Sequence, residues 1–280
     1  MNMIIKALIP IYLIWGFNWV VMKLANNYFE PITFVTYRFV SGALVLLLIS
    51  FIFKHSLPQR RFIPWIIITG AFQIALNSII VQMCIQPIGA GFSAVLNYTM
   101  PIWVAVLAQF FLNEKLTQKK IVGIIVSIIG LAILMNIDIT GNVNYIFIAL
   151  AGAFSWAVSN IIFKLKLAGC DMIVYNTWQM TVGAVILVLV SILTGQDIGN
   201  WTAISASYVI YNGVLASALA FFLWSYVLLH MEAGKASVAV LAVPVVGVIC
   251  GIIFLGEPIT FSSAIGMIMI LTGVVRVLKS

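Results

Sequence analysis

Charged residues are scarce in this chain: they make up 8% of its 280 residues, whereas a soluble globular domain carries about 25%. Hydrophobic residues make up 64%, and the mean hydropathy is +1.19. A water-soluble fold of this composition would lack the polar side chains needed to cover its surface. The sequence therefore excludes a soluble domain and predicts an all-α polytopic membrane protein.

Cysteine and histidine are also rare, and catalytic motifs are missing. Cys84, Cys170 and Cys250 are scattered and odd in number, so no disulfide framework is expected. His55 and His230 lie near predicted helix ends without neighbours suited to a metal. The sequence contains no Walker phosphate-binding loop, HExxH or GxSxG motif. We therefore expect no metal site, no cofactor and no enzymatic activity.

Basic residues outnumber acidic ones by 14 to 7, and they fall in the short gaps between apolar runs. This placement follows the positive-inside rule and does not indicate binding to nucleic acid. If the N-terminus is cytoplasmic, nearly all basic residues face the cytoplasm; Lys23 falls outside, and Arg38 lies within a helix. The sequence thus predicts a multi-pass protein of the cell (inner or plasma) membrane with both termini in the cytoplasm.

Apolar runs of roughly 20 residues, the length that crosses a bilayer, divide the chain into ten predicted helices. They cover residues 4–22, 31–53, 63–85, 91–112, 120–136, 145–163, 172–194, 205–229, 235–255 and 261–278. The uncharged stretch 62–113 is too long for one crossing, and the proline and glycines of 86–91 supply the break. The loops are too short to hold a soluble domain.

The second half of the chain repeats features of the first. Trp15 recurs as Trp156 and Lys23 as Lys164 at one constant spacing; Gly91 recurs as Gly234, Pro101 as Pro244 and Glu114 as Glu257 at a slightly longer one. Because five is an odd number of crossings, the second unit must enter the membrane upside down. The sequence predicts two inverted five-helix repeats, residues 1–137 and 145–280, with a linker at 138–144. Secondary transporters have this architecture, with the substrate site near the midplane between the halves.

Several motifs occur in a characteristic order: Trp15-Gly16-Phe17-Asn18 with Lys23, Pro31 with Arg38-Phe39, Pro101 with Leu112-Asn113-Glu114, Phe254-Leu255-Gly256-Glu257, and the glycines 123, 130, 266 and 273. In this order the chain resembles the ten-helix, EamA-type members of the drug/metabolite transporter superfamily. It departs from the family pattern at Asn113, where glycine is usual, and at Gln179, where the second half could have repeated Arg38. The resemblance implies export or exchange of small metabolites, often amino acids.

Arg38 is the charged residue that lies well inside a predicted helix. It follows Pro31 by seven residues, about 10 Å along the helix axis. An arginine at membrane depth costs roughly 2.5–3.5 kcal/mol on insertion scales, so we expect it to face the bundle interior. Either it anchors a substrate carboxylate or another anionic group, or it snorkels outward or binds helix-end carbonyls.

Pro101 and Pro244 fall near the centres of two predicted helices. Proline removes a backbone hydrogen bond and displaces the carbonyl four residues earlier, here those of Asn97 and Val240. A freed carbonyl at membrane depth needs protein or water to satisfy it. We interpret both prolines as hinges at a cavity wall; the alternative is a static, well-packed kink.

Polar and amphipathic side chains at membrane depth form the predicted substrate site. They are Trp15, Asn18, Tyr37, Arg38, Asn77, Asn97, Tyr98, Trp156, Ser159, Asn160, Gln179, Ser217 and Trp224. Aromatic rings shield the apolar part of a metabolite, and amides fix its orientation. The alternative for each residue is ordinary packing or a bond to a neighbouring helix.

Glu114 and Glu257 end two predicted helices on opposite sides of the membrane. We expect each to bond the start of the following helix, near Thr117 or Thr260, as a structural cap. The alternative is a role in gating. No carboxylate is predicted at the midplane, so a proton relay through a buried acid is not favoured.

The leading hypothesis is a secondary transporter that exports amino acids or related metabolites by alternating access. Its expected partners are a small-molecule substrate and the lipid bilayer; the oligomeric state is left open. The alternatives are a drug or nucleotide-sugar carrier, an intramembrane lipid-modifying enzyme, and a scaffold or receptor that transports nothing. The enzyme would need a buried histidine or carboxylate beside a nucleophile, and none is predicted in the membrane interior.

Overall fold

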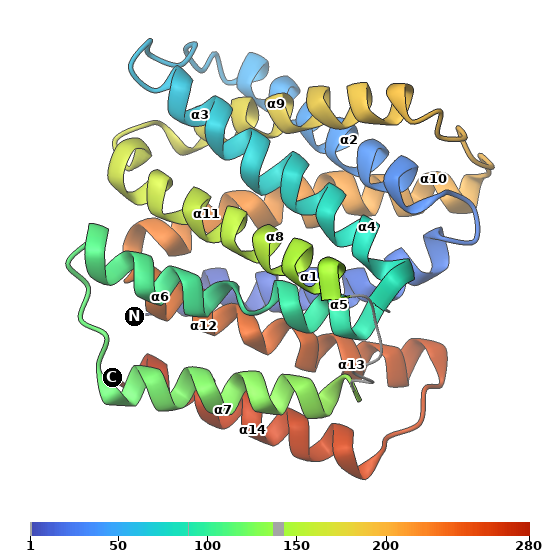
Figure 1. The fold of residues 1–280 in the computed structure, drawn as a ribbon. Helices are drawn as coiled ribbons and strands as arrows, with labels where there is room; N and C mark the ends of the chain where they lie inside the picture. The colour runs from blue at the N-terminus through green and yellow to red at the C-terminus, as the bar shows by residue number, and fades with distance from the viewer. Residues whose placement is uncertain (1, 89, 137–142) are drawn as a thin grey trace.

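The computed structural model describes residues 2–88, 90–136 and 143–280, and these residues form helices and short connections without a β-strand. The helices make up ten spans of one bundle (Figure 1). In chain order they are α1 (Asn2–Ala25), α2 (Pro31–Ile52), α3–η1–α4 (Ile63–Thr69, Gly70–Leu76, Asn77–Ile88), α5–α6 (Ala90–Asn97, Met100–Phe111), α7 (Gln118–Leu134), α8–η2 (Val143–Ile162, Phe163–Leu167), α9 (Met172–Leu193), α10–η3–α11 (Ala203–Ile210, Tyr211–Leu219, Ala220–His230), α12–η4–α13 (Ala233–Ala239, Val240–Ala242, Val243–Leu255) and α14 (Phe261–Leu278).

Within the described part of the chain, nine of these spans have at least 18 residues and enough apolar character to cross a membrane. The other, α7, has 17 residues. Large apolar side chains such as Leu13, Phe110 and Ile192 are exposed on the outside of the bundle. Lipid is the medium that accommodates such a surface. The prediction of an all-α, ten-helix, multi-pass membrane protein is confirmed.

Figure 1 places both termini at the same edge of the bundle, which we call the terminal end; the opposite edge is the distal end. Successive spans run in opposite directions, so α1 runs toward the distal end and α8 runs toward the terminal end. Because α1 and α8 open the two five-span units, the units are inverted as predicted. The expected linker 138–144 lies largely outside the described residues, and its last two residues already belong to α8.

Helices α7 and α14 pack through glycines that are counterparts in the two repeats. A Cβ atom on Gly123 would lie 2.8 Å from the carbonyl oxygen of Gly273, and one on Gly130 would lie 2.9 Å from that of Gly266. Such backbone approach requires small residues. In the sequence repeat, Gly266 is the counterpart of Gly123 and Gly273 that of Gly130. Gly123 therefore packs against the counterpart of Gly130, and Gly130 packs against the counterpart of Gly123. A pseudo-two-fold axis between the repeats requires this arrangement.

A second pair of glycine contacts follows the same symmetry. A Cβ atom on Gly42 in α2 would lie 3.1 Å from the carbonyl oxygen of Gly213 in η3, and one on Gly183 in α9 would lie 3.1 Å from that of Gly70 in η1. Both η1 and η3 are π-helical segments, a feature that is frequent at functional sites. These contacts fix which side chains of η1 and η3 face the bundle interior.

The spans that contain Pro101 and Pro244 are interrupted at equivalent places. α5 ends at Asn97 and α6 begins at Met100, while the short 3₁₀ turn η4 separates α12 from α13. Each proline is the second residue of a new helix, where its missing N–H is not needed. The proline spans are therefore broken at the level of the cavity described below, and the hinge role stays a prediction.

Candidate functional site

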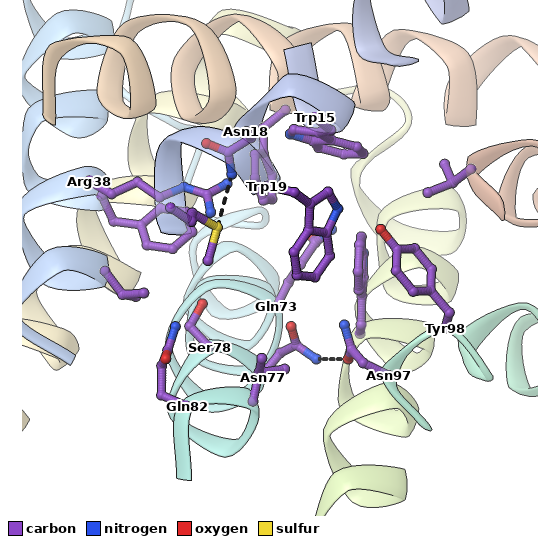
Figure 2. A pocket seen from close by; sticks show the side chains of 17 residues that line it. Trp15, Asn18, Trp19, Arg38, Gln73, Asn77, Ser78, Gln82, Asn97 and Tyr98 are labelled. Atoms are coloured by element: carbon purple, nitrogen blue, oxygen red, sulfur yellow. Dashed lines mark hydrogen bonds between the residues drawn. The ribbon is translucent and has the colours of Figure 1, made fainter. Parts of the chain in front are cut away.

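A cavity of about 140 Å³ lies inside the bundle (Figure 2). Its wall combines one cationic side chain, several amides and hydroxyls, and many aromatic rings. The lining residues are Trp15, Asn18, Trp19, Met22, Val35, Arg38, Phe39, Gln73, Asn77, Ser78, Val81, Gln82, Asn97, Tyr98, Trp156, Phe221 and Val240. Both repeats contribute, so the cavity lies where the two units meet.

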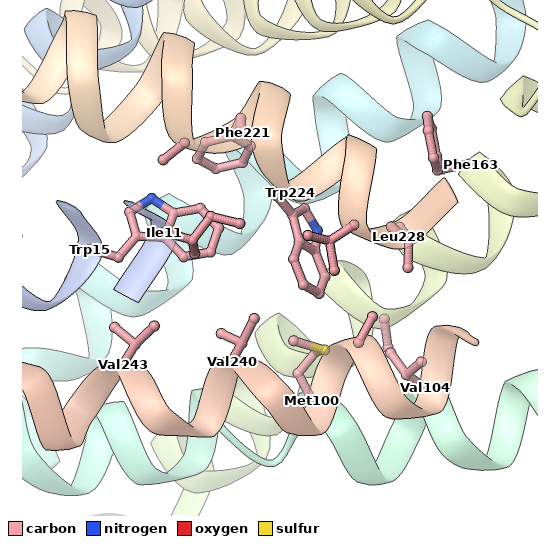
Figure 3. Packing of buried hydrophobic residues seen from close by; sticks show 14 of the residues in the cluster. Ile11, Trp15, Met100, Val104, Phe163, Phe221, Trp224, Leu228, Val240 and Val243 are labelled. Carbon is pink, nitrogen blue, oxygen red and sulfur yellow. The ribbon is translucent and has the colours of Figure 1, made fainter. Parts of the chain in front are cut away.

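The cavity occupies the distal half of the bundle. On α1 and on the α3–η1–α4 span, which both run toward the distal end, the lining residues begin near the middle, at Trp15 and Gln73. Between this level and the terminal end, apolar side chains fill the interior (Figure 3). Val104, Trp224 and Leu228 are each at most 2% exposed. The packed terminal half therefore closes the cavity on that side.

Arg38 is the cationic group of the cavity wall, and η3 holds it in place. Its Nε donates to Ser217 Oγ at 2.9 Å, and its Nη2 donates to the Ala216 carbonyl at 3.3 Å. The guanidinium carbon lies 4.9 Å from the centre of the Phe39 ring. Among the described residues, no carboxylate lies within 4 Å of Arg38. Its positive charge therefore has no fixed anionic partner and is suited to binding an anionic ligand group.

Amide side chains form a polar band opposite Arg38 (Figure 2). Asn77 Nδ2 donates to Asn97 Oδ1 at 2.7 Å and to the Gly152 carbonyl at 2.9 Å. Gln179 Nε2 donates to Gln73 Oε1 at 2.8 Å from behind the cavity wall. These bonds hold Asn77 and Gln73 in fixed orientations.

Four buried polar atoms of the lining have no hydrogen-bond partner among the described residues. They are the acceptors Asn18 Oδ1 and Gln82 Oε1 and the donors Gln73 Nε2 and Trp156 Nε1. Buried polar atoms are almost always paired, and exceptions mark functional places. The wall of the cavity thus contains two donors and two acceptors whose hydrogen bonds the described residues do not supply.

Aromatic rings form the remaining wall. Trp15 and Trp156 meet edge to face with ring centroids 6.4 Å apart, and Trp15 contacts Phe221 at 5.5 Å. Trp15 Nε1 donates to the Ala216 carbonyl at 2.9 Å, the same oxygen that Arg38 bonds. The rings and the arginine therefore share one structural support, and a wall of this kind suits the apolar part of a ligand.

Seven of the thirteen residues predicted for the site line this cavity: Trp15, Asn18, Arg38, Asn77, Asn97, Tyr98 and Trp156. Two more, Gln179 and Ser217, lie behind the wall and bond Gln73 and Arg38. Tyr37 lies at the distal end, where its hydroxyl donates to the Ile198 carbonyl at 3.0 Å.

The other three predicted residues lie in the packed interior outside the cavity lining. Trp224 Nε1 donates to Asn160 Oδ1 at 3.2 Å, and Ser159 Oγ donates to the Ser155 carbonyl of its own helix at 3.2 Å. All three are at most 2% exposed. Their polar groups satisfy one another or the backbone, as the packing alternative expected.

Sequence reasoning missed Trp19, Gln73, Ser78 and Gln82, as well as the apolar lining. Gln73 and Asn77 lie four residues apart, which places these two amides on one face of a helix. Gln82 falls on the opposite face of a regular α-helix, and the π-helical turns of η1 shift this register. Their spacing, in an uncharged span, is the signal that would have found Gln73; no such signal marks Trp19, Ser78 or Gln82. As for metals, no group of three or more His, Cys, Asp or Glu in the described residues could hold an ion.

Comparison with solved structures supports the architecture. One crystal structure matches with a TM-score of 0.84 over 99% of this chain and 96% of the other, at 15% sequence identity. At that identity the likeness concerns the fold alone.

Comparison of sequences gives relatives that cover nearly the whole chain. This chain is 32% identical to the Uncharacterized transporter YoaV of Bacillus subtilis over 279 residues, which cover 97% of this chain and 95% of the relative. It is 25% identical over 283 residues, 94% of this chain and 90% of the relative, to a Probable amino-acid metabolite efflux pump of Salmonella typhimurium. The EamA-like transporter family matches twice, at residues 2–136 and 143–279. The chain therefore belongs to the EamA-like transporter family.

Proposed function

We propose that this protein is a secondary transporter that exports amino acids or closely related carboxylate metabolites by alternating access. The observation that carries the proposal is Arg38, a cation without a described carboxylate partner in a cavity between two inverted repeats. An unpaired cation at membrane depth is costly and is expected to serve a ligand. A carboxylate on the guanidinium would supply the missing partner with charge-assisted hydrogen bonds.

The unpartnered polar atoms favour a ligand that also donates hydrogen bonds. The ammonium group of an amino acid is a donor, and Asn18 Oδ1 and Gln82 Oε1 are free acceptors in the wall as the structure describes it. Aromatic rings such as Trp19 and Trp156 also attract cations over their faces. A zwitterion thus finds an anionic subsite, neutral acceptors and an apolar wall in one cavity.

The cavity is too small to favour a nucleotide-sugar as the substrate. Its volume of about 140 Å³ is close to that of a roughly 150 Å³ engineered cavity that holds benzene. Arg38 is the single cationic residue of the described lining, whereas two phosphates would call for more positive charge. A small monocarboxylate fits both the volume and the charge.

Export is the direction that the relatives support. The Salmonella typhimurium relative is named as an efflux pump for amino-acid metabolites. The positive-inside distribution predicts that the terminal end faces the cytoplasm of a cell membrane. With that orientation the cavity of this conformation lies on the outer side, from which an exported substrate would leave.

Uptake into liposomes tests the proposal directly. The purified protein is reconstituted and given radiolabelled alanine, propionate or ethylamine, which separate the carboxylate from the ammonium group. We expect uptake of alanine, weaker uptake of propionate and none of ethylamine. Arg38→Gln should lower the alanine rate at least about tenfold, the loss of one charge-assisted bond.

Lys119→Gln is the matched control, because it removes an exposed charge near the terminal end. Its uptake should equal that of the unaltered protein. Equal uptake by the Arg38→Gln protein, or transport of ethylamine in preference to both carboxylates, would show that Arg38 does not bind a substrate carboxylate.

A further inference from the structure

The connections at the terminal end of the bundle are joined by a largely buried ion pair and its hydrogen bonds. Glu114 Oε1 accepts a hydrogen bond from the backbone N–H of Ala233 at 2.6 Å, and Oε2 accepts one from Gly234 at 3.0 Å. Lys164 Nζ lies 3.8 Å from Glu114 Oε1 and donates to the Met231 carbonyl at 2.6 Å. The Glu114 and Lys164 side chains are 11% and 19% exposed. They therefore tie the end of α6 to the ends of α8–η2 and the start of α12.

This arrangement differs from the sequence prediction for Glu114. The expectation that Glu114 bonds the start of the following helix near Thr117 is wrong. Thr117 caps that helix itself, since its Oγ1 accepts from the Lys120 N–H at 3.3 Å. Glu114 instead bonds a helix start in the other repeat, so its bonds cross the boundary between the two units.

A second ion pair reinforces the same end. Lys120 Nζ lies 2.5 Å from Glu232 Oε2 and donates to the Lys115 carbonyl at 2.9 Å. The Lys120 side chain is 6% exposed. Glu232 immediately precedes the helix start that Glu114 bonds. The terminal end is thus held by two acid–base pairs across the repeat boundary.

The distal end carries the symmetry counterparts of the first pair. In the sequence repeat, Glu257 is the counterpart of Glu114, and Lys23 is the counterpart of Lys164. Lys23 Nζ lies 2.6 Å from Glu257 Oε1, but the side chains are 64% and 42% exposed. Exposed pairs contribute little to stability. Counterpart residues thus form a largely buried ion pair at the terminal end and a solvent-exposed ion pair at the distal end.

The backbone at the two glutamates is nearly the same, so the difference lies in the side-chain partners. Glu114 N–H donates to the Ala108 carbonyl at 3.1 Å, and Glu257 N–H donates to the equivalent Gly251 carbonyl at 3.4 Å. The Glu257 carboxylate lies against Gly251, in space that a side chain there would occupy. The counterparts of Ala233 and Gly234 are Ala90 and Gly91, which begin α5.

We infer that Glu114 with Lys164, and Glu257 with Lys23, are two alternating gates, of which the terminal one is shut in this conformation. The inference rests on the proposed alternating access. When the terminal end opens, the Glu114 carboxylate gives up its hydrogen bonds to the backbone at the start of α12. The Glu257 carboxylate then leaves its contact with Gly251, bonds the backbone at the start of α5 and closes the distal end. Because the repeats are inverted, the second state reuses the contacts of the first with the halves exchanged.

Side-specific cysteine labelling tests the gate without any substrate. Cys84, Cys170 and Cys250 are first replaced by alanine, and Val104→Cys then places one thiol in the terminal half. Val104 is 0% exposed and lies between the cavity and the terminal end. Membrane-impermeant maleimide is added to inside-out or right-side-out vesicles, and a separate Ser280→Cys protein shows which vesicles expose the terminal end.

We expect Glu114→Ala to raise labelling of position 104 severalfold, from the terminal side alone. Lys164→Met should act in the same direction, and it provides a second variant if Glu114→Ala folds poorly. The counterpart variants Glu257→Ala and Lys23→Met should leave labelling at its low starting level. Lys166→Gln, an exposed charge two residues from Lys164, is the matched control and should change nothing.

Three other labelling results distinguish unfolding, a wrong gate and a wrong substrate. Labelling that rises from both sides reports unfolding, and the comparison then passes to Lys164→Met. Unchanged labelling in Glu114→Ala and Lys164→Met, or an equal rise in Glu257→Ala, overturns the gate. Because no ligand is added, a gate that behaves as expected in a protein that transports no amino acid would overturn the substrate proposal alone.

Discussion

Trp15 and Trp156 occupy equivalent positions in the two repeats, and their rings meet edge to face with centroids 6.4 Å apart. Their indole N–H groups have different surroundings. Trp15 Nε1 donates to the Ala216 carbonyl, whereas Trp156 Nε1 is buried at the cavity without a partner among the described residues. The pseudo-symmetric pair thus has one indole N–H that bonds the backbone and one that has no partner among the described residues.

This difference predicts different effects for the same substitution. Trp15→Phe removes the donor to Ala216 and should lower the free energy of unfolding by about 1 kcal/mol, the usual net value of a hydrogen bond. Trp156→Phe should leave stability nearly unchanged and raise the KM for transport severalfold. Thermal unfolding and liposome uptake on both proteins measure the two effects. An unchanged KM in Trp156→Phe would show that its N–H is not a ligand donor.

Gln179 positions Gln73 from behind the cavity wall, through the 2.8 Å bond between Nε2 and Gln73 Oε1. Gln179→Ala should free the Gln73 amide to turn and raise KM about five- to tenfold, which corresponds to a bond of about 1 kcal/mol. Thr181→Ala on the same helix is the control, since its hydroxyl bonds only the Thr177 carbonyl of that helix. Equal KM values in the two variants would contradict a positioning role.

The contact of α7 with α14 predicts a stability effect at glycine. A Cβ atom on Gly266 would lie 2.6 Å from the Gly130 carbonyl oxygen and 2.7 Å from the Leu134 backbone nitrogen, neither of which can move without shifting a helix. Gly266→Ala should destabilise the protein by roughly 1–3 kcal/mol, the cost of overpacking. Gly169→Ala meets nothing within 4 Å and should be neutral. Thermal unfolding in detergent compares them.

Acidification should lower the stability of the fold by protonating the Glu232 carboxylate at the terminal end. Burial alone would raise the pKa of Glu232, but the hydrogen bond and charge of Lys120, with the charges of Lys235 and Lys164, lower it overall. A carboxyl whose pKa is lower in the folded state stabilises the fold above its unfolded pKa of about 4.3 and loses that contribution as pH falls through the folded pKa.

The corresponding measurement is thermal stability of the unaltered protein and of Glu232→Gln between neutral pH and pH 3. Glu232→Gln should be less stable at neutral pH, by about 1 kcal/mol or less because the side chain is half exposed. The difference should shrink below about pH 4. A constant difference across this range would mean that the Glu232 charge does not stabilise the fold.

The spans could be predicted because hydropathy and sequence breaks mark their ends. Pro31 is the first residue of α2 and Asp171 caps the start of α9, and charges or short polar runs separate most other spans. The sequence predicts Pro101 near the centre of a helix, but the structure has a break before it, because proline is favoured at a helix start. Hydropathy alone does not locate such interruptions.

The cavity could be predicted only in part, because depth in the membrane does not give the direction a side chain faces. The sequence predicts Arg38 and Asn77 for the site because polar groups at membrane depth are costly, and both line the cavity. Asn160 is equally polar and deep, yet it pairs with Trp224 in the packed core. Glycine contacts such as Gly42 with Gly213 fix the rotation of each helix, and these depend on the tertiary fold.

The central claim is that the cavity opens to one end at a time, and distances between spin labels test it most directly. One pair is placed at Asn27 and Pro258 at the distal end, and another at Lys115 and Lys166 at the terminal end, all exposed in this structure. On adding a transported amino acid, we expect the distal distance to shorten as the terminal distance lengthens. Distances at both ends that lengthen together, or that stay fixed while transport proceeds, would contradict alternating access.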